Sequence, residues 1–292
     1  MKIINLGSLN IDHVYQVSHF VRPGETLSSS EYSRHPGGKG LNQSVALARA
    51  GAAVAHWGKV GGEGIWLRDV RQQAGANVAG VIESVVPTGH AIIQVDARGQ
   101  NSILLFGGAN QSLTAEEVGQ LLATGDPGDI LLLQNEVNRL PEIVIKARER
   151  GLHIALNPAP FDAGIRQLPL GSLRYLILNE VEGADLTGES NPERILAQLA
   201  ELAPECAIVL TLGADGVRAR YAGKEWSLPA ERVAPIDTTA AGDTFIGFFL
   251  AARSRGLDME ESLTIANHAA SVCVTRRGAA VSIPTWAEVV GS

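Results

Sequence analysis

The sequence predicts an α/β protein with a mainly parallel central sheet, helices on both faces and a small additional β-sheet. Three observations favour this class. Short apolar runs alternate with longer helical patterns, the runs are nearly continuous in Val, Ile, Leu and Ala, and two polar, turn-rich segments interrupt the alternation. Continuous apolar strands are typical of a sheet buried on both faces, and strand–helix alternation is typical of parallel pairing.

The apolar runs predict six strands: Ile3–Leu6, Val54–Val60, Ile130–Leu133, His153–Leu156, Tyr175–Leu178 and Ile208–Leu212. The helical patterns predict seven helices: Leu41–Ala50, Ile65–Gln73, Ala115–Ala123, Pro141–Arg150, Pro192–Leu202, about Ala241–Arg255 and Met259–Arg276. The 292 residues include 45% hydrophobic but only 5% aromatic side chains. Aliphatic residues are therefore expected to fill a large core, and disorder is not expected.

The two interrupting segments both have β character. Residues 11–34 are polar and rich in turns, and His90–Phe106 has the pattern of a hairpin with its turn at residues 97–100. Apolar residues alternate along the hairpin at Ile93, Val95, Ile103 and Leu105. We expect these segments to form a small sheet that covers a site; edge strands of the main sheet are the alternative.

Composition excludes several classes of function. Lys and Arg number 24 against 31 Asp and Glu, a net charge of −7, so a nucleic-acid partner is not expected, although a local cationic pocket for one phosphate is allowed. Cys206 and Cys273 lie far apart and are expected to be buried small hydrophobes, not a disulfide or a zinc site. The seven histidines show no paired spacing for a metal.

No basic segment followed by a long apolar run occurs at the N-terminus, and no window approaches 18 uninterrupted apolar residues. Neither a signal peptide nor a membrane span is therefore expected. We expect a cytoplasmic protein that acts on small molecules.

The segment Asp237-Thr-Thr-Ala-Ala-Gly-Asp-Thr-Phe comes directly before an apolar helical run. The small residues Ala240, Ala241 and Gly242 let a ligand approach the backbone, where first-turn N–H groups face an anion. Asp243 would lie beside this anion hole, where a carboxylate can accept the proton of a hydroxyl that attacks phosphorus. A second interpretation is that Asp243 only caps the helix.

A second glycine-rich turn, Pro36-Gly-Gly-Lys-Gly-Leu-Asn-Gln, also leads into a helix. It is not a P-loop, because Lys39 is followed by glycine and the glycine spacing is wrong. Its glycines, with Lys39 and Asn42, can bring backbone and polar side chains against a polyol; a plain helix start is the alternative.

Polar clusters follow several expected strands: Asn10 and Asp12, Gln134-Asn-Glu, and Asn179-Glu-Val-Glu. Ligands bind outside the carboxyl ends of the strands in open α/β sheets, so a site is expected there. The single Gly7 after the first strand is no dinucleotide fingerprint, which disfavours an NAD-linked oxidoreductase.

Together these residues resemble the PfkB family of carbohydrate kinases, and most of all its ribokinase branch. The resemblance covers essentially the whole chain. It depends on Gly7-Ser-Leu-Asn-Ile-Asp, Gly37-Gly-Lys-Gly-Leu-Asn-Gln, Thr88-Gly89, Gly108-Ala-Asn, Asn157-Pro-Ala-Pro, Asn179-Glu-Val-Glu, Thr211-Leu-Gly, Asp237-Thr-Thr-Ala-Ala-Gly-Asp-Thr-Phe and Thr275-Arg-Arg-Gly-Ala. The 37–43 and 237–245 blocks are specific as a pair.

The resemblance implies ATP-dependent phosphorylation of a sugar primary hydroxyl, most of all that of D-ribose, with Mg²⁺ and a monovalent cation such as K⁺ as cofactors. It implies that Asp243 is the base and that the amides of Ala240, Ala241 and Gly242 form the anion hole. Sugar contacts are implied for Asn10, Asp12, Gly38, Lys39, Asn42, Glu136 and Asp243. Asn179 and Glu182 are implied to organise Mg²⁺ and phosphate through water, and Thr211, Gly213 and Asn267 to bind the nucleotide. The monovalent cation is implied to bind, mostly through backbone oxygens, at Asp237, Thr239, Cys273, Arg276, Gly278 and Ser282.

The resemblance also implies a core of residues 1–10, 35–89 and 108–292 that holds the nucleotide site, and a β lid of residues 11–34 and 90–107 over the sugar. A small sheet is marginal in isolation, so the lid is expected to hide a face against a second copy in a homodimer. A monomer whose own core covers the lid, as in the nucleoside-kinase branch, is the alternative.

Two departures from the family pattern concern the choice of sugar and the packing of the lid. Val60-Gly-Gly-Glu-Gly-Ile-Trp replaces the usual Gly-Asp-Asp-x-x-Gly, so Trp66 stands where a small residue is common, and Glu136 follows Gln-Asn where Gln-Leu is frequent. Deoxyribose, another sugar or a nucleoside are alternative substrates. A sugar-binding protein without catalysis is the alternative from another class, which the presence of Asp243 disfavours.

Overall fold

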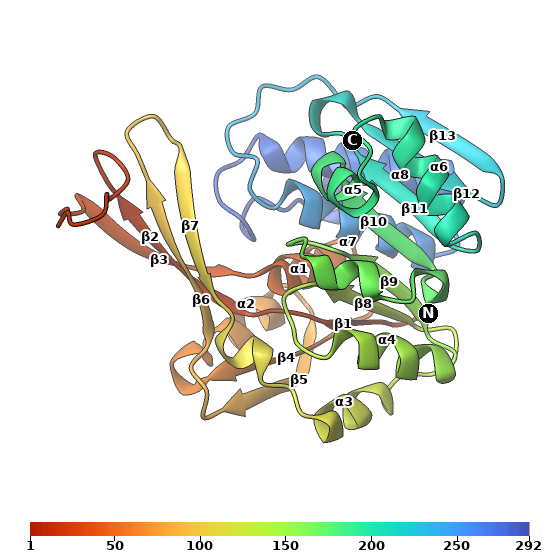
Figure 1. Cartoon of the computed structure of the whole chain (residues 1–292), viewed down its shortest axis with the longest axis horizontal. Coiled ribbons are helices and arrows are strands. Elements are labelled where there is room, and N and C mark those ends of the chain that lie inside the picture. The colour runs from red at the N-terminus through yellow and green to blue at the C-terminus, as the bar shows by residue number, and fades with distance from the viewer. Residues whose placement is uncertain (292) are drawn as a thin grey trace.

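The computed structural model of the chain describes residues 1–291 and contains a nine-stranded sheet, helices on both its faces and a separate four-stranded sheet (Figure 1). In sheet order the nine strands are β13 (Lys224–Leu228), β12 (Val217–Tyr221), β11 (Ala207–Thr211), β10 (Tyr175–Asn179), β9 (His153–Asn157), β8 (Ile130–Gln134), β1 (Ile3–Leu6), β4 (Val54–Gly61) and β5 (Asn77–Ser84). The pairings β11–β12 and β12–β13 at one edge are antiparallel, and all other neighbours pair in parallel. The predicted α/β class with a mainly parallel sheet is confirmed.

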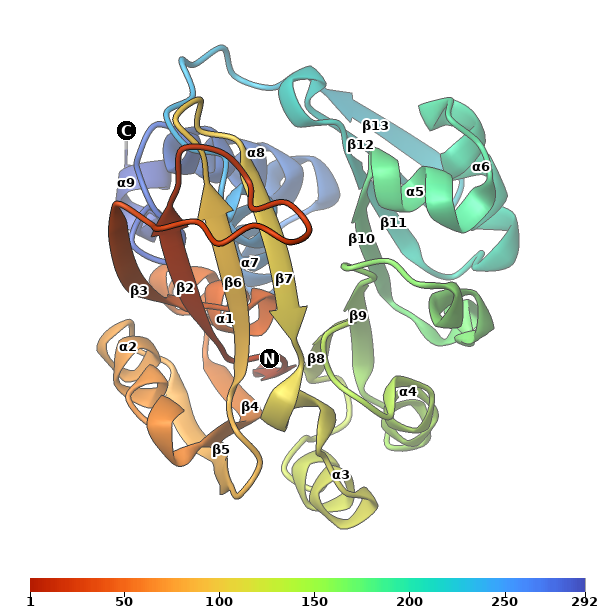
Figure 2. The same ribbon diagram turned by 60° about the vertical axis from the view of Figure 1, so that its left-hand side comes forward.

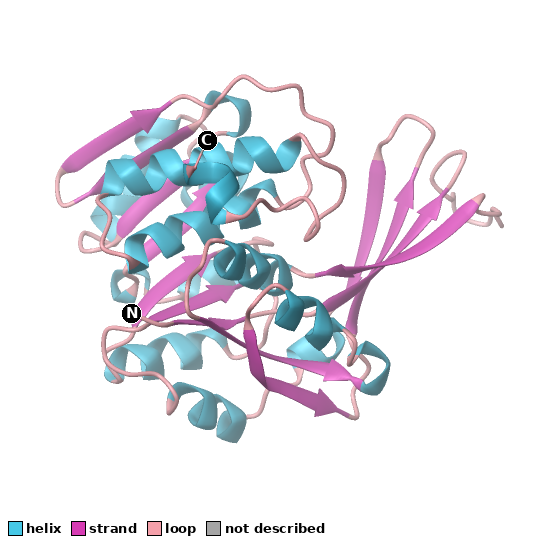
Figure 3. Ribbon diagram, turned by 180° about the vertical axis from the view of Figure 1, so that it is seen from behind, coloured by secondary structure: helices cyan, strands magenta, loops and turns pink. Residues whose placement is uncertain are grey.

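The helices form one layer on each face of the sheet. The layer nearer the viewer in Figure 1 contains α3 (Ala115–Leu122), α4 (Leu140–Glu149), α5 (Glu180–Thr187) and α6 (Pro192–Leu202). The other layer, in front in Figure 3, contains α1 (Lys39–Arg49), α2 (Leu67–Gln73), α7 (Ala241–Ser254), α8 (Met259–Val274) and α9 (Trp286–Val290). Each layer encloses its own apolar core, because successive strand residues point to opposite faces; Leu132 belongs to the core under α1 and α7, and Leu133 to the core under α4.

The two interrupting segments form the four-stranded sheet, hereafter the small sheet, and are not edges of the large one. Its strands lie side by side in the order β3 (Glu31–Gly37), β2 (Asn10–Gln16), β6 (Gly89–Val95) and β7 (Asn101–Phe106) (Figure 2). Strands β2 and β6 pair in parallel, whereas β2–β3 and β6–β7 are antiparallel. The predicted hairpin over residues 90–106 is therefore correct.

Strand register decides which face of the small sheet the apolar hairpin residues occupy. Val14 pairs with Ile93, which pairs with Ile103, and paired residues point to the same side. Because Val14 and Asp12 lie two positions apart on β2, the apolar row shares its face with Asp12. The opposite face carries a cluster of rings, namely His13, Tyr15, Tyr32, His90 and Phe106. On β7, Ile103 and Leu104 are 57% and 68% exposed on opposite faces, so apolar surface is uncovered on both.

Sequence patterns missed five elements: β5, β12, β13, α5 and α9. Strands β12 and β13 contain charged residues because they form an edge. The five residues of α9 are too few to show a helical period, and the apolar and polar residues of α5 are not separated onto opposite sides of the helix. The predicted helix from Ile65 begins at Leu67, after a 3₁₀ turn at Gly62–Gly64. Trp66, at this start, stacks under the guanidinium of Arg34 on β3 at 5.1 Å, so this departure from the family pattern contacts the small sheet.

Cys206 and Cys273 are separate, buried thiols, as expected. Within residues 1–291, no helix has both the length and the apolar character needed to cross a membrane.

Candidate active site

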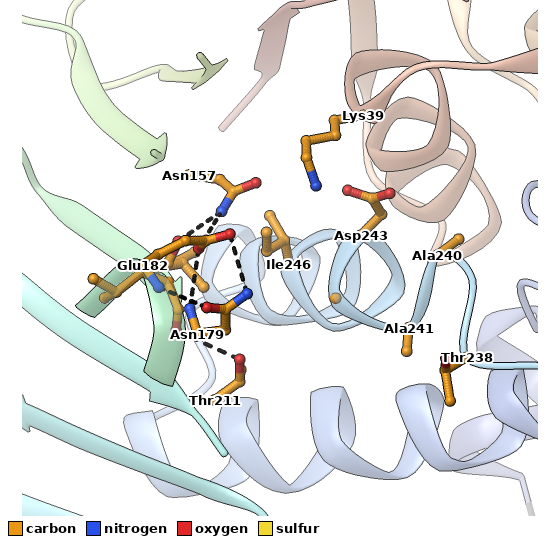
Figure 4. A pocket seen from close by; sticks show the side chains of 13 residues that line it. Lys39, Asn157, Asn179, Glu182, Thr211, Thr238, Ala240, Ala241, Asp243 and Ile246 are labelled. Carbon is orange, nitrogen blue, oxygen red and sulfur yellow. Dashed lines mark hydrogen bonds between the residues drawn. The ribbon is translucent and has the colours of Figure 1, made fainter. Parts of the chain in front are cut away.

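Several of the predicted site residues, among them Lys39, Glu182 and Asp243, lie together at the carboxyl ends of the parallel strands, where α1, α5 and α7 begin (Figure 4). A cavity of about 230 Å³ lies there. It is lined by Lys39, Asn157, Ile177, Leu178, Asn179, Glu182, Thr211, Thr238, Ala240, Ala241, Gly242, Asp243 and Ile246. A second cavity, of about 440 Å³, adjoins it, because Thr211, Thr238, Ala241 and Gly242 line both.

The N-terminus of α7 borders both cavities. Its N-cap residue, Ala240, has φ 62°, a left-handed conformation that is strained for a residue other than glycine, and no side chain caps the helix. The N–H of Ala241 donates to the Thr238 carbonyl at 3.3 Å, whereas no hydrogen bond within residues 1–291 uses the N–H of Ala240 or Gly242. Free N–H groups at the positive end of a helix dipole suit an anion, so two of the three predicted donors are available.

Asp243 lies in the first turn of α7 with 8% of its surface exposed. Its Oδ2 accepts a hydrogen bond from Asn42 Nδ2 at 3.1 Å, and its Oδ1 accepts one from Gln43 Nε2 at 2.8 Å. Because the carboxylate binds side chains of α1 and leaves the N-terminus of α7 uncapped, the helix-cap interpretation is wrong. Amide donors orient the carboxylate without neutralising it, which leaves it able to accept a proton.

Lys39, at the start of α1, points its ammonium into the first cavity beside Asp243 (Figure 4). Burial by itself would lower the pKa of Lys39, but the charges of Asp243, Glu136 and Glu182 together outweigh it and raise this pKa. The side chain is therefore a stable cation among three carboxylates, between the predicted sugar contacts and the N-terminus of α7.

Two carboxyl groups belong to the predicted sugar region. Burial, and secondly the charge of Glu136, raise the pKa of Asp12 to about 7. Burial also raises the pKa of Glu136, although Glu136 accepts hydrogen bonds from the Ser8 hydroxyl and from the Lys39 N–H, the latter at 3.0 Å. Acidic groups that are desolvated in this way are typical of positions that meet a ligand.

Asparagine side chains complete this region. Asn10 Oδ1 accepts from Asn110 Nδ2 at 2.8 Å, and Asn110 Oδ1 accepts the Leu9 N–H at 2.9 Å. Asn42 Oδ1 is buried and has no hydrogen-bond partner in the described chain. A buried acceptor without a donor is costly, so it suits a hydroxyl of a bound polyol. Gly38 has φ 95°, a conformation that favours glycine at the turn into α1.

The far side of the first cavity is acidic. Asn179 and Glu182 form a capping box at the start of α5, with the Asn179 side chain accepting the Glu182 N–H at 2.8 Å. Burial, the largest influence, raises the pKa of Glu182, and Asn157 Nδ2 lies 3.5 Å from its Oε2. A desolvated carboxylate beside a polar cavity fits a hard cation such as Mg²⁺, with or without an intervening water.

The second cavity contains the three predicted nucleotide residues, Thr211, Gly213 and Asn267. Much of its lining is apolar, including Val233, Pro235, Phe245, Ala270 and Val274. An apolar cavity that opens into a polar one beside a helix N-terminus fits a purine ring whose phosphates extend toward Asp243.

The predicted cation residues lie around the loop between α8 and α9. The Asp237 carboxylate accepts the N–H and the hydroxyl of Thr239 at 2.9 and 2.6 Å and the N–H of Gly278 at 2.9 Å. Burial opposes ionisation, but these hydrogen bonds prevail and lower the pKa of Asp237. Cys273 Sγ lies 3.1 Å from Ser282 Oγ. One ionised carboxylate among carbonyls and a hydroxyl fits a large monovalent cation.

Two arginines lie at the loop between α8 and α9, hereafter the cation loop. The Arg276 guanidinium binds Glu288 at 2.8 Å, so only the backbone of Arg276 faces the loop. Arg49, which the sequence analysis missed, donates to the carbonyls of Ala280 at 2.9 Å and Val281 at 3.4 Å, and also to that of Ile283. Part of the loop is thus already neutralised by the end of α1. No cluster of three or more His, Cys, Asp or Glu side chains that could hold a metal occurs within residues 1–291.

The sequence analysis also missed residues that hold the site together. Gln43 and Asn157 lie within quoted motifs but received no role. Gln134 was noted only as part of a polar cluster after a strand, and Asn5 gave no local signal, because the importance of both depends on which strands lie side by side.

The comparisons with known proteins agree with this geometry. Residues 1–286 match the family described as pfkB family carbohydrate kinase. The chain is 37% identical to the ribokinase of Haemophilus influenzae, over 98% of this chain and 96% of that protein. The crystal structure of ribokinase from Thermotoga maritima superposes with a TM-score of 0.89 at 35% identity, covering 100% and 98% of the two chains. The structure of Arabidopsis thaliana ribokinase complexed with ribose and ATP has a TM-score of 0.88 at 27% identity, covering 99% and 97%. Because the family match and the identity to ribokinases both extend over nearly the full length, the chain belongs to the pfkB family of carbohydrate kinases.

Proposed function

We propose that the protein is an ATP-dependent sugar kinase that converts D-ribose to D-ribose 5-phosphate. The observation that carries the proposal is the position of Asp243. Its buried carboxylate accepts hydrogen bonds from the side-chain amides of Asn42 and Gln43, and it lies between the polar region suited to a polyol and the free N–H groups of α7. The similarity to ribokinases, one of them solved with ribose and ATP, supports the same substrates.

In this mechanism the sugar's primary hydroxyl lies against Asp243 and attacks the γ-phosphorus of ATP. The new phosphorus–oxygen bond forms as the bond to the β,γ-bridging oxygen breaks, ADP leaves with that electron pair, and Asp243 takes the hydroxyl proton. The Lys39 ammonium and the Gly242 N–H, which line the same cavity as Asp243, would meet the negative charge that gathers on the transferred group. Preorganised donors of this kind stabilise phosphoryl transfer.

Two metal ions are part of the proposal. Glu182 and Asn179 would hold Mg²⁺ through water, and the ion would neutralise charge on the nucleotide phosphates. A monovalent cation such as K⁺ would bind the Asp237 carboxylate and the backbone oxygens of Thr239, Cys273, Arg276 and Gly278, with the Ser282 hydroxyl. Because this loop adjoins Ala240, the cation would steady the turn that presents the N–H groups.

The choice of ribose over 2-deoxyribose follows from the acceptors in the sugar region. The buried Asn42 Oδ1 has no donor in the described chain, and the carboxyl groups of Asp12 and Glu136 are further acceptors beside it. A substrate without one hydroxyl would leave a buried acceptor unmatched, at a cost of about 1–3 kcal/mol. Similarity to a deoxyribokinase of Salmonella typhi, at 30% identity, makes 2-deoxyribose the second candidate.

We also propose that residues 11–34 and 90–107 act as a lid over the sugar and join two copies into a homodimer. The exposed apolar side chains on both faces of β7 support this, since a monomer would leave them in water. The need for ATP and the two free thiols agree with a cytoplasmic location.

Replacing the base tests the proposal. Asp243→Asn is expected to retain ribose and ATP affinity and to lower kcat by about 10²–10⁴, because an amide cannot take the proton. Asp69→Asn is the matched control, since Asp69 is an exposed residue at the same position in the first turn of α2. ADP release is measured with ribose, 2-deoxyribose, hexoses and nucleosides. Turnover of nucleosides alone, or near-native kcat in Asp243→Asn, would contradict the proposal.

A further inference from the structure

A chain of hydrogen-bonded, buried side-chain amides connects strands β1 and β8 of the large sheet to Asp243. Its members are Asn5 on β1, Gln134 on β8 and Gln43 on α1, and none of the three has any solvent-exposed surface. They lie on the face of the sheet that packs against α1, where the neighbouring strand positions are aliphatic. Buried polar groups in such a place require partners, and their hydrogen bonds show what these amides do.

The contacts follow one path. Asn5 Nδ2 donates to the backbone carbonyl of Gly40 at 2.8 Å and to the Ser44 hydroxyl at 2.8 Å. Gln134 Nε2 donates to Asn5 Oδ1 at 2.9 Å and to Gln43 Oε1 at 2.7 Å. Gln43 Nε2 then donates to Asp243 Oδ1 at 2.8 Å and lies 3.3 Å from Asn157 Oδ1.

The direction of every hydrogen bond in this path is fixed by its first acceptor. A backbone carbonyl can only accept, so the Asn5 side chain must present its NH₂ to Gly40 and its oxygen to Gln134. Gln134 must then present its NH₂ toward Asn5, and the second hydrogen of that NH₂ reaches Gln43 Oε1. Gln43 is left with its NH₂ toward Asp243, so the orientation imposed from a main-chain group at the start of α1 is the one that the carboxylate, which can only accept when ionised, also requires.

The geometry points to a role for this chain in catalysis, which rests on the proposed function of Asp243 as base. We propose that Gln134 and Asn5 are positioning residues: they lock the amide orientation of Gln43, which holds Asp243 Oδ1, so that Oδ2, which also accepts from Asn42, meets the sugar hydroxyl with its remaining lone pair. With Gln43 reversed, its oxygen would face the carboxylate and repel it. Gln134 uses both hydrogens for this purpose while its own Oε1 stays buried without a partner, a cost consistent with a functional requirement.

Three variants test the order of action: Gln134→Met, Gln43→Met and the double variant. Methionine keeps the length and burial of glutamine but cannot donate. Gln134→Met is expected to lower kcat by about ten- to a hundredfold, as for a reacting group displaced by a fraction of an ångström to 1 Å, while the KM for ribose changes less than about threefold. Because Gln134 acts through Gln43, the double variant should be no slower than Gln43→Met alone.

Gln134→Glu supplies a second readout and an isosteric alternative in case Gln134→Met does not fold. The introduced carboxyl group has no hydrogen to donate when it is ionised, whereas its protonated form has one. A buried glutamate has a raised pKa, so the ratio of variant to wild-type kcat should rise as the pH falls from 8 to 6. Ser262→Ala is the matched control, because Ser262 is equally buried and donates to the Asp258 carbonyl at 2.6 Å in α8. It should lower the free energy of unfolding and leave kcat unchanged.

Unchanged kcat in Gln134→Met, kcat losses that multiply in the double variant, or a pH-independent ratio for Gln134→Glu would each overturn the inference. These outcomes differ from a failure of the proposed function, which would show as no sugar turnover by the wild type or as an active Asp243→Asn variant.

Discussion

Gly247 allows α7, which carries the proposed base Asp243, to pack directly on α1, which carries the amide donors to Asp243. It lies one helical turn after Asp243 and is buried. A Cβ at this position would lie 2.9 Å from the Ala46 carbonyl carbon and from the Leu47 nitrogen, and closer still to the Ala46 Cβ, whereas ordinary contact begins at 3.4 Å. Backbone atoms cannot rotate away, so in Gly247→Ala the two helices must move apart.

Two effects of opposite sign set the stability of Gly247→Ala. Alanine in a helix interior is more favourable than glycine by about 0.5–1 kcal/mol. Overpacking of a buried contact costs about 1–3 kcal/mol. The free energy of unfolding should therefore fall by about 0–2.5 kcal/mol. The hydrogen bonds from Asn42 and Gln43 to Asp243 cross this helix pair, so kcat should fall by about tenfold or more, with a smaller change in sugar KM.

Urea unfolding followed by the fluorescence of the four tryptophans, together with steady-state ADP release, measures both effects. Gly119→Ala is the matched control, because Gly119 also lies within a helix, α3, but no atom lies within 4 Å of an added Cβ. Gly119→Ala should gain about 0.5–1 kcal/mol and retain wild-type kcat. If Gly247→Ala is as stable and as active as Gly119→Ala, the contact between α1 and α7 does not position the base.

Four further predictions concern the sugar region, the cation loop and the small sheet. Because the pKa of Asp12 is raised to about 7, the carboxylate is mostly protonated below that pH, and the KM for ribose should fall about tenfold between pH 6 and pH 8. Asp12→Asn should remove this dependence, and a flat wild-type profile would contradict it. Burial favours the protonated form of Asp12 in the folded protein, so the contribution of Asp12 to the free energy of unfolding is present below its ordinary pKa and is lost as the pH rises through about 7. Asp12→Asn, which stays neutral, should therefore be more stable than wild type at pH 8. Replacing a tetraalkylammonium salt by K⁺ should raise kcat in the wild type but not in Asp237→Asn; equal wild-type rates in the two salts would show that no cation acts there. Light scattering should give twice the 30.8 kDa chain mass at micromolar concentration, and a monomer mass would refute the dimer.

Much of the fold could be predicted from the sequence because its strands are buried on both faces. The runs from Ile130 and Tyr175 consist of consecutive aliphatic residues, which a strand covered by helices on both sides requires. Strands β12 and β13 escaped prediction for the converse reason, since an antiparallel edge exposes alternate residues and admits Arg218 and Glu225.

The parts of the site that depend on one strand end or one helix start could also be predicted. The turn before α7 presents free N–H groups because of its own backbone conformation, so a local pattern of small residues followed by an aspartate is informative. The face of the small sheet that bears Ile93 and Ile103 could not be predicted, because alternation fixes which residues share a face but not which face meets Asp12. That depends on the pairing of β6 with β2.

The amide chain could not be predicted for a related reason. Asn5, Gln43 and Gln134 are separated by tens of residues, and nothing in the local sequence of any of them points to the other two. Asn5 and Gln134 become neighbours only because β1 and β8 lie side by side, although more than a hundred residues separate them in the chain. Helix α1 lies over the same two strands, since the Leu41 N–H donates to the Ser8 carbonyl at 3.0 Å and a Cβ on Gly40 would overlap the backbone of Gly7. The order β8-β1-β4 and the close contact of α1 on β1 therefore place three remote amides in one line, and the orientation of Asp243 is a property of the large sheet as much as of its own helix.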